Sequence, residues 1–326
     1  MSIHRRFASC AVLLLAACGD VDPADDPVGP RPGHITYTDG DDVYRLAAEV
    51  GAAPENVSAQ ITRGARAADR RLNLSAGGVS YVFETSNVDP VCADRRCLAV
   101  ASAADPGDAR LVLPDGERIE HAENLAAVDD AAAIVVYAAG GGPHDRDLFA
   151  TLRSGDTWSA PRLLTAGSTF AWNDQPSLAP DADRLLFDCG PEANAGPGGS
   201  ICEVGLDGAV VTIVATPDDA PAAIGQRGPL HHAAYAGADV IFEADWDGER
   251  IWRWSGDRAT ALTPPTSTND NSPCVLPDGR IASLYLDDPG NPNGLHELKV
   301  MDASGADPTL LVTGLDLDDL GLGCGR

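Results

Sequence analysis

The chain has 326 residues, of which 44% are hydrophobic and only 5% are aromatic. This share of apolar residues is enough for a folded core and excludes a wholly disordered chain. The formal net charge is −26 and Lys299 is the only lysine. Such a charge repels phosphate backbones, so we expect no nucleic-acid partner. The composition is that of a soluble folded body, and we expect it to be monomeric.

The first residues carry the signals of export. Met1–Ala17 has a basic start, an apolar run and then small residues, which is the order found in secretory signals. The junction Leu15-Ala16-Ala17-Cys18 resembles the lipobox of bacterial lipoproteins. This resemblance implies that residues 1–17 are a signal peptide and that Cys18 carries lipid at the mature N-terminus. We therefore expect a lipid anchor on the inner or outer membrane of a cell envelope.

A short acidic segment follows the lipidation site. Residues 18–33 are rich in Asp, Pro and Gly and contain almost nothing that could be buried. We expect them to form a flexible tether. No later apolar run is long enough to cross a membrane, so residues 34–326 should be a folded body held in the periplasm or on the cell surface.

Repeats organise this folded body. Asn173–Asp188 (NDQPSLAPDADRLLFD) and Asn269–Leu284 (NDNSPCVLPDGRIASL) share an Asn-Asp opening, a Pro-Asp turn and an apolar run. Weaker copies occur at Arg71–Phe83, Glu123–Tyr137 and Pro229–Phe242. Equivalent turns are separated by about 40–55 residues, the spacing of four-stranded propeller blades.

The two ends of the chain supply the remaining blade. Leu315–Arg326 reads as the opening of a repeat, and the segment that starts at His34 reads as a repeat without its opening. Pairing the two ends completes one sheet and removes exposed sheet edges. We expect an all-β, six-bladed β-propeller closed by a blade that both termini share, with seven blades as the alternative.

The two best repeats resemble those of TolB-like, WD-type β-propellers, whose hallmark is a Ser-Pro-Asp-Gly turn ahead of an apolar strand. Pro180-Asp181 and Pro277-Asp278-Gly279 carry this turn. The resemblance implies a binding module in the periplasm that recognises an envelope protein or a glycan at one mouth of its central channel. A fold does not by itself fix a function.

Six cysteines remain after Cys10 and Cys18 are set aside. An even number in an exported chain predicts disulfides, although six cysteines allow fifteen pairings and spacing does not choose among them. The repeats favour two bridges that each span a loop within one repeat, and a third that joins the last full repeat to the C-terminus. The expected pairs are Cys92–Cys97, Cys189–Cys202 and Cys274–Cys324.

Candidate binding residues stand at the blade openings, near one mouth of the channel. Asn and Asp recur there, and they either cap turns through local hydrogen bonds or form a polar ring for a ligand. We select Trp172 at the rim, the polar residues Asp174, Asp270 and Asn271 at the openings, and His231 on an inner strand.

An enzyme using the same channel is the alternative. No GxSxG, HExxH or Gly-Lys-Ser/Thr motif occurs, so we assign no catalytic residue. Some propeller polysaccharide lyases resemble this repeat type and use channel histidines, and a lyase or glycosidase here would use His231, His121 and Asp174. Neighbouring strand residues point to opposite faces, so at most one of His231 and His232 faces the channel. We expect no cofactor or metal, with calcium or another divalent cation at the acidic turns as the alternative.

Overall fold

The computed structural model describes most of the expected folded body. The described residues are 33–61, 68–92, 97–119, 123–192, 198–265, 269–286, 294–317 and 321–326. The expected signal peptide, the lipidation site Cys18 and the candidate residue His121 lie outside them. One compact unit spans Pro32–Arg326. In the described ranges, no helix has the length and apolar character needed to cross a membrane.

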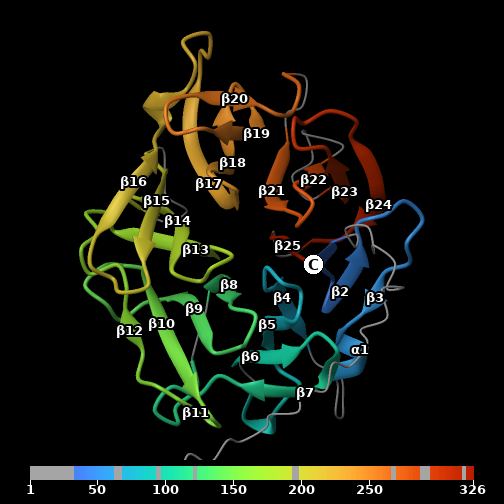
Figure 1. Cartoon of the computed structure of the whole chain (residues 1–326), viewed down its shortest axis with the longest axis vertical. Coiled ribbons are helices and arrows are strands. Elements are labelled where there is room, and N and C mark those ends of the chain that lie inside the picture. The colour runs from blue at the N-terminus through green and yellow to red at the C-terminus, as the bar shows by residue number, and fades with distance from the viewer. Residues whose placement is uncertain are drawn as a thin grey trace, which may run out of the picture. The chain divides into compact units, whose positions relative to one another are not determined.

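Six antiparallel sheets surround a central axis as the blades of a propeller (Figure 1). The first blade contains β25 (Gly323–Gly325), β1 (His34–Asp39), β2 (Asp42–Ala47) and β3 (Glu55–Asn56). The second contains β4 (Asp69–Leu74), β5 (Ser80–Thr85), β6 (Cys97–Ser102) and β7 (Asp105–Leu111). The third contains β8 (Glu123–Val128), β9 (Ile134–Ala139), β10 (Asp147–Ser154), β11 (Thr157–Trp158) and β12 (Arg162–Leu163).

The remaining blades each have four strands. The fourth contains β13 (Trp172–Leu178), β14 (Arg184–Gly190), β15 (Ser200–Gly205) and β16 (Val211–Ala215). The fifth contains β17 (Arg227–Ala236), β18 (Asp239–Trp246), β19 (Glu249–Trp254) and β20 (Ala259–Ala261). The sixth contains β21 (Asp270–Val275), β22 (Ile281–Leu286), β23 (His296–Met301) and β24 (Thr309–Leu315). The helix α1 (Ser58–Ile61) and the 3₁₀ turn Pro217–Asp219 lie between blades, and the 3₁₀ turn Pro90–Cys92 lies between β5 and β6 of the second blade.

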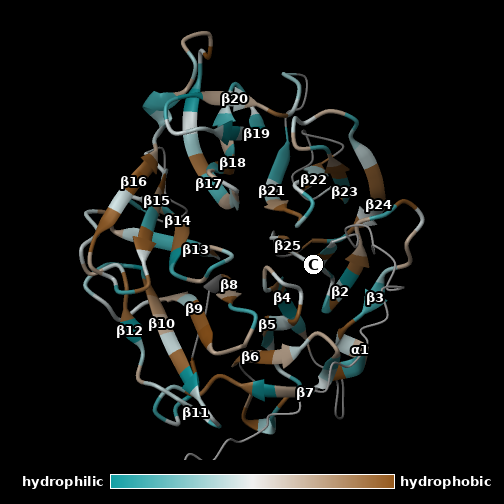
Figure 2. Cartoon of the chain, viewed as in Figure 1, coloured by the Kyte–Doolittle hydropathy of each residue, from teal (hydrophilic) through white to brown (hydrophobic). Residues whose placement is uncertain are grey.

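The second strand of each blade is largely buried because both of its faces are covered by neighbouring blades. All six residues of β5 are buried, and so are six of the seven residues of β14. The outer strand β16 instead leaves Thr212 and Ile213 exposed. Figure 2 shows apolar residues along the strands and many polar residues in the connecting loops. Apolar clusters between neighbouring blades therefore form the core.

The two ends of the chain close the ring as the repeats predict. Strand β25 pairs antiparallel with β1, and Cys324 lies opposite Ile35. A side chain on Gly323 would bring its Cβ within 2.4 Å of Thr36 Oγ1, and one on Gly325 within 2.4 Å of the Ser75 carbonyl oxygen. Glycine is thus required where the last strand enters the crowded centre. The prediction of six blades with one shared blade is confirmed.

Three disulfides join the pairs expected from the repeats. Their Cα–Cα distances are 5.7 Å for Cys92–Cys97, 6.0 Å for Cys189–Cys202 and 5.6 Å for Cys274–Cys324. The third bridge links β21 of the sixth blade to β25 of the first. It therefore crosses the junction at which the ring is closed.

We predict that loss of the closing disulfide destabilises the protein more than loss of the shortest one. In the chain-entropy treatment, a bridge of sequence separation 50 contributes about 4 kcal/mol and one of separation 5 contributes about 2 kcal/mol. Denaturant unfolding of the Cys274→Ser/Cys324→Ser variant, with Cys92→Ser/Cys97→Ser as the matched control, measures the difference. Equal losses in the two variants would contradict a special role for the closing bridge.

Candidate functional site

The innermost strands of the six blades, β25, β4, β8, β13, β17 and β21, surround the central axis. Five of them shift register against the next strand, and in four of these strands a shift contains a non-glycine residue with left-handed φ. These residues are Arg71 (φ 55°), Gln175 (53°), His232 (52°) and Ser272 (49°). A bulge of this kind turns a backbone N–H out of the sheet.

Three of the turned N–H groups bond to the preceding blade. Arg71 N donates to Thr38 Oγ1 at 3.1 Å. His232 N donates to the Asp188 carboxylate at 3.0 Å, and Ser272 N donates to Glu243 Oε2 at 3.0 Å. These acceptors lie on β1, β14 and β18, so each bond crosses between two neighbouring blades. The bulges therefore hold the ring of innermost strands together.

A cavity of about 530 Å³ lies inside this ring. All six innermost strands line it, for example through Leu74, Val128, Leu178, Tyr235, Val275 and Cys324. Its lining extends to Ala76, Pro180, Gly237 and Gly279, which lie in the turns after the innermost strands. We call it the channel cavity; it reaches the face of the ring that carries these turns.

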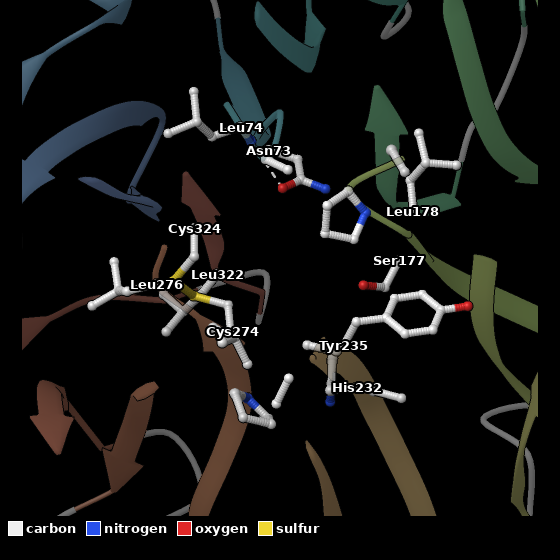
Figure 3. A pocket seen from close by; sticks show the side chains of 18 of the residues that line it. Asn73, Leu74, Ser177, Leu178, His232, Tyr235, Cys274, Leu276, Leu322 and Cys324 are labelled. Atoms are coloured by element: carbon white, nitrogen blue, oxygen red, sulfur yellow. Dashed lines mark hydrogen bonds between the residues drawn. A yellow bond between two sulfur atoms is a disulfide. The ribbon is translucent and has the colours of Figure 1, made fainter. Parts of the chain in front are cut away.

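The wall of the channel cavity presents apolar and polar groups in comparable amounts. Figure 3 shows the Cys274–Cys324 disulfide beside Leu276 and Leu322. Ser177 and Tyr235 lie together on another part of the wall. Such a wall offers a ligand both apolar contacts and hydrogen-bonding groups.

The predicted histidine pair lies on β17, one of the strands that line this cavity. His232 is part of its lining and His231 is not, in agreement with the expectation that at most one of them faces the channel. His231 Nδ1 lies 3.4 Å from Asp188 Oδ2, and His232 Nδ1 lies 3.0 Å from Glu243 Oε2. Each imidazole thus has its own carboxylate.

These contacts change the proton affinity of both imidazoles. Burial alone would lower the pKa of His231, but the hydrogen bond and charge of Asp188 outweigh it and raise that pKa to about 9. Burial likewise opposes the charge on His232, yet the bond to Glu243 raises the pKa of His232. Burial and the charge of Glu243 raise the pKa of Glu249 to about 7. At neutral pH His231 is therefore a cation within an acidic group.

The predicted rim residues Trp172 and Asp174 lie on β13, before its bulge, and outside the lining of the channel cavity. The Arg146 guanidinium stacks over the Trp172 ring at 4.2 Å from the centroid and donates to Asp174 Oδ2 at 3.3 Å. Asp174 is only 1% exposed and also accepts from Gln175 N. Trp172 is half-buried, so of these two it is the residue that a ligand could reach.

The other two predicted residues, Asp270 and Asn271, are also buried. Asp270 lines a second, smaller cavity of about 190 Å³, together with Tyr285 and Lys299 of the sixth blade. Asp174, Asp270 and His231 thus lie on three different innermost strands and have different neighbours. His121, the third residue of the enzymatic alternative, lies outside the described residues.

Sequence reasoning missed most of the channel cavity. Gln175, Ser177 and Leu178 follow the recognised Asn-Asp opening directly, and Tyr235 has the equivalent place on β17. The apolar pair after each opening was visible as a strand, but nothing in the pattern indicated which of its faces lines the cavity.

Among the described residues, no three His, Cys, Asp or Glu side chains gather as a metal site.

Solved structures with the same architecture are found among known proteins. A putative TolB from Agrobacterium tumefaciens superimposes with a TM-score of 0.58 at 14% identity, over 88% of this chain and 92% of that one. TolB from Acinetobacter baumannii gives 0.62 at 11% identity, over 91% of this chain and 67% of that one. The chain has the fold of a TolB-like β-propeller. A chain of a nidogen–laminin complex superimposes with a TM-score of 0.59 at 10% identity, over 90% of this chain and 97% of that one.

No protein-family model and no curated protein sequence matches the chain. The TolB-like propeller is therefore recognised by its fold, and identities of 10–14% carry no residue roles over to this chain. The site must be interpreted from its own side chains.

We predict that the stability of the TolB-like propeller falls as pH rises from about 6.5 to about 9. The pKa of His231 is higher in the folded state than in the unfolded state, so protonated His231 stabilises the folded protein. This contribution is fully present below pH 6.5 and is lost as pH rises past 9. His231→Gln should remove on the order of 2–3 kcal/mol of this change. Denaturant unfolding at stepped pH measures the free energy of unfolding.

His296→Gln is the control for this pH dependence. Burial lowers the pKa of His296, so its titration lies below the interval in which His231 acts. The fall in the free energy of unfolding between pH 6.5 and 9 should therefore persist in His296→Gln and be smaller in His231→Gln. An unchanged slope in His231→Gln would show that the Asp188 contact does not hold the proton.

Proposed function

We propose that this chain is a cell-envelope lipoprotein whose TolB-like propeller is a binding module for a protein partner. The partner inserts a segment into the channel cavity from the face that carries the turns after the innermost strands. The channel cavity itself supports this proposal most directly, since it has about 530 Å³ of space and a wall contributed by every blade.

The rim residues remain part of the proposal at the other end of the channel. Trp172 is half-buried and backed by Arg146, so its ring is held in one orientation. Asp174, Asp270 and Asn271 are buried, and we assign them to shaping the strand openings around Trp172 and His231. Partner contact at this end would rest on Trp172 and on the half-buried His231.

The comparisons support a binding module through the fold. One matching chain comes from a complex between nidogen and laminin, so a propeller of this architecture occurs in a protein–protein complex. In this chain, the described residues hold no metal-ligand cluster, and the candidate His231 and Asp174 are each engaged by another side chain. Binding therefore requires fewer further assumptions than catalysis.

We predict that filling the channel cavity abolishes capture of the partner. Ser177 lies on the cavity wall, and Ser177→Trp would place an indole in the space that the partner segment needs. Affinity capture of cross-linked partners from the source organism's envelope, with the intact lipoprotein as bait, measures the loss. Thr212→Trp is the matched control, because Thr212 is exposed on the outer strand of the same blade.

The rim variant Trp172→Ala separates the two ends of the channel. If capture survives Ser177→Trp but is lost in Trp172→Ala, recognition occurs at the strand openings and the cavity is not the site. If neither variant nor the pair together changes the captured protein, the channel is not involved in binding.

We also predict that Cys18→Ser releases the protein from the membrane. The support for lipidation is the order of basic start, apolar run and small residues before Cys18. Labelled palmitate should enter the natural chain and be absent from Cys18→Ser, which should move to the soluble fraction. Cys10→Ser, which changes a cysteine within the expected signal, is the control and should keep the label.

A further inference from the structure

The interface between the fifth and sixth blades is less apolar than the other five. Its apolar cluster is limited to Ile241, Ile251, Leu262, Ile281 and Met301, with Ala236 and Val275 at its edge. The other interfaces contain larger clusters, including the tryptophans between the fourth and fifth blades. Beyond this small cluster lies the cavity of about 190 Å³, which we call the interblade cavity.

Strand register brings the polar side chains of Ser283, Lys299 and Asp270 into the interblade cavity. Ile281, Ser283 and Tyr285 alternate along β22 and so share one face. Lys299 lies opposite Ser283 on β23, and Asp270 lies opposite Tyr285 on β21. The face that packs against the fifth blade is thus apolar at Ile281 and polar from Ser283 onward.

One of these groups lacks a partner. Ser283 is 1% exposed, and its hydroxyl makes no hydrogen bond within the described residues. A buried hydroxyl without a partner is destabilising, so such groups are usually bonded to a ligand or to water. Ser283 lines the interblade cavity, where a ligand would supply the missing bond.

The charges in the cavity are of both signs. The Lys299 ammonium lies 3.2 Å from the centroid of the Tyr285 ring. Asp270 is 3% exposed and lies within the electrostatic range of Lys299. Burial raises the pKa of Asp270 to about 6, against the opposing effects of Lys299, Thr263 and Arg250, so its carboxyl is ionised at pH 8.

The size and walls of the cavity limit the ligand further. A cavity of about 150 Å³ holds one benzene molecule, so the interblade cavity accepts a slightly larger molecule. Met301, Pro264 and Pro308 supply apolar walls. Pro264 and Pro308 are exposed, so the cavity reaches the surface there.

We propose that the interblade cavity binds a small zwitterion, namely a free α-amino acid with a short apolar side chain. The ligand carboxylate contacts Lys299 and accepts the hydrogen bond of Ser283, and the ligand ammonium contacts Asp270. An anion alone would face the Asp270 carboxylate, and a cation alone would face Lys299, so a ligand with both charges complements the site best. This site is separate from the channel cavity and does not depend on the proposed partner.

The test is calorimetric titration of the full-length lipoprotein in detergent at pH 8 with L-valine, isobutyrate and isopropylammonium. We expect valine to bind and the two singly charged analogues to bind at least roughly tenfold more weakly, the loss expected for one charge-assisted hydrogen bond. Equal binding of isobutyrate, or no binding of valine, would overturn the proposal.

Variants assign the binding to this cavity. Lys299→Met keeps the aliphatic stem and removes the charge, and Ser283→Ala removes the hydroxyl; each should weaken valine binding roughly tenfold or more. Arg258→Met is the matched control, because it removes a cation from an exposed turn of the neighbouring blade. Valine binding that is unchanged in Lys299→Met would overturn the proposal.

The single lysine gives a second readout that needs no variant. Reductive methylation with isotope-labelled formaldehyde introduces one lysine signal into the NMR spectrum, because Lys299 is the only lysine. Valine should shift this signal and isobutyrate should leave it nearly in place. If saturating valine does not move the Lys299 signal, the ligand binds elsewhere and the proposal is wrong.

Discussion

Pairing of the last strand with the first is the interaction on which the whole ring depends. Without β25, the first blade would expose the edge of β1 at the centre of the ring, and the sixth blade would lose a neighbour. Three features hold the pair in place: glycines that allow close approach, a disulfide to the sixth blade, and the Arg326 carbonyl, which lies 3.1 Å from His34 Nδ1. The closure also gives the channel cavity its sixth wall.

The bulges explain why polar residues recur at the blade openings. Each blade must bond to the next near the axis, where pairing between sheets is limited to isolated bridges such as Arg146–Trp172 and Glu249–Asn269. Bulges at Arg71, His232 and Ser272 provide the donors, and Thr38, Asp188 and Glu243 provide the acceptors. Buried backbone N–H groups need such partners. At the opening of β13 the repeated Asn-Asp pair itself joins two blades, because Asn173 Nδ2 donates to the Arg146 carbonyl oxygen at 3.0 Å and Arg146 donates to Asp174 Oδ2 at 3.3 Å.

The sequence predicts features whose signal repeats, and misses those that arise from contacts between repeats. The blade count, the shared blade and the three disulfides follow from a pattern that recurs at regular spacing. The bulges carry no such signal, because left-handed φ occurs here at Arg71, Gln175, His232 and Ser272 rather than at glycine or asparagine. The interblade cavity was equally hidden, since Thr263 and Lys299 meet only after two blades pack.

The charge of the chain connects its two cavities. A net charge of −26 creates a field that repels anionic partners at long range, so a ligand that reaches either cavity should be neutral or cationic overall. Most internal cations are already paired, such as Arg71 with Glu84 and Arg146 with Asp174. Lys299 instead lies over an aromatic ring in a cavity with a carboxylate. A protein segment without net negative charge in the channel and a zwitterion between two blades both avoid the repulsion.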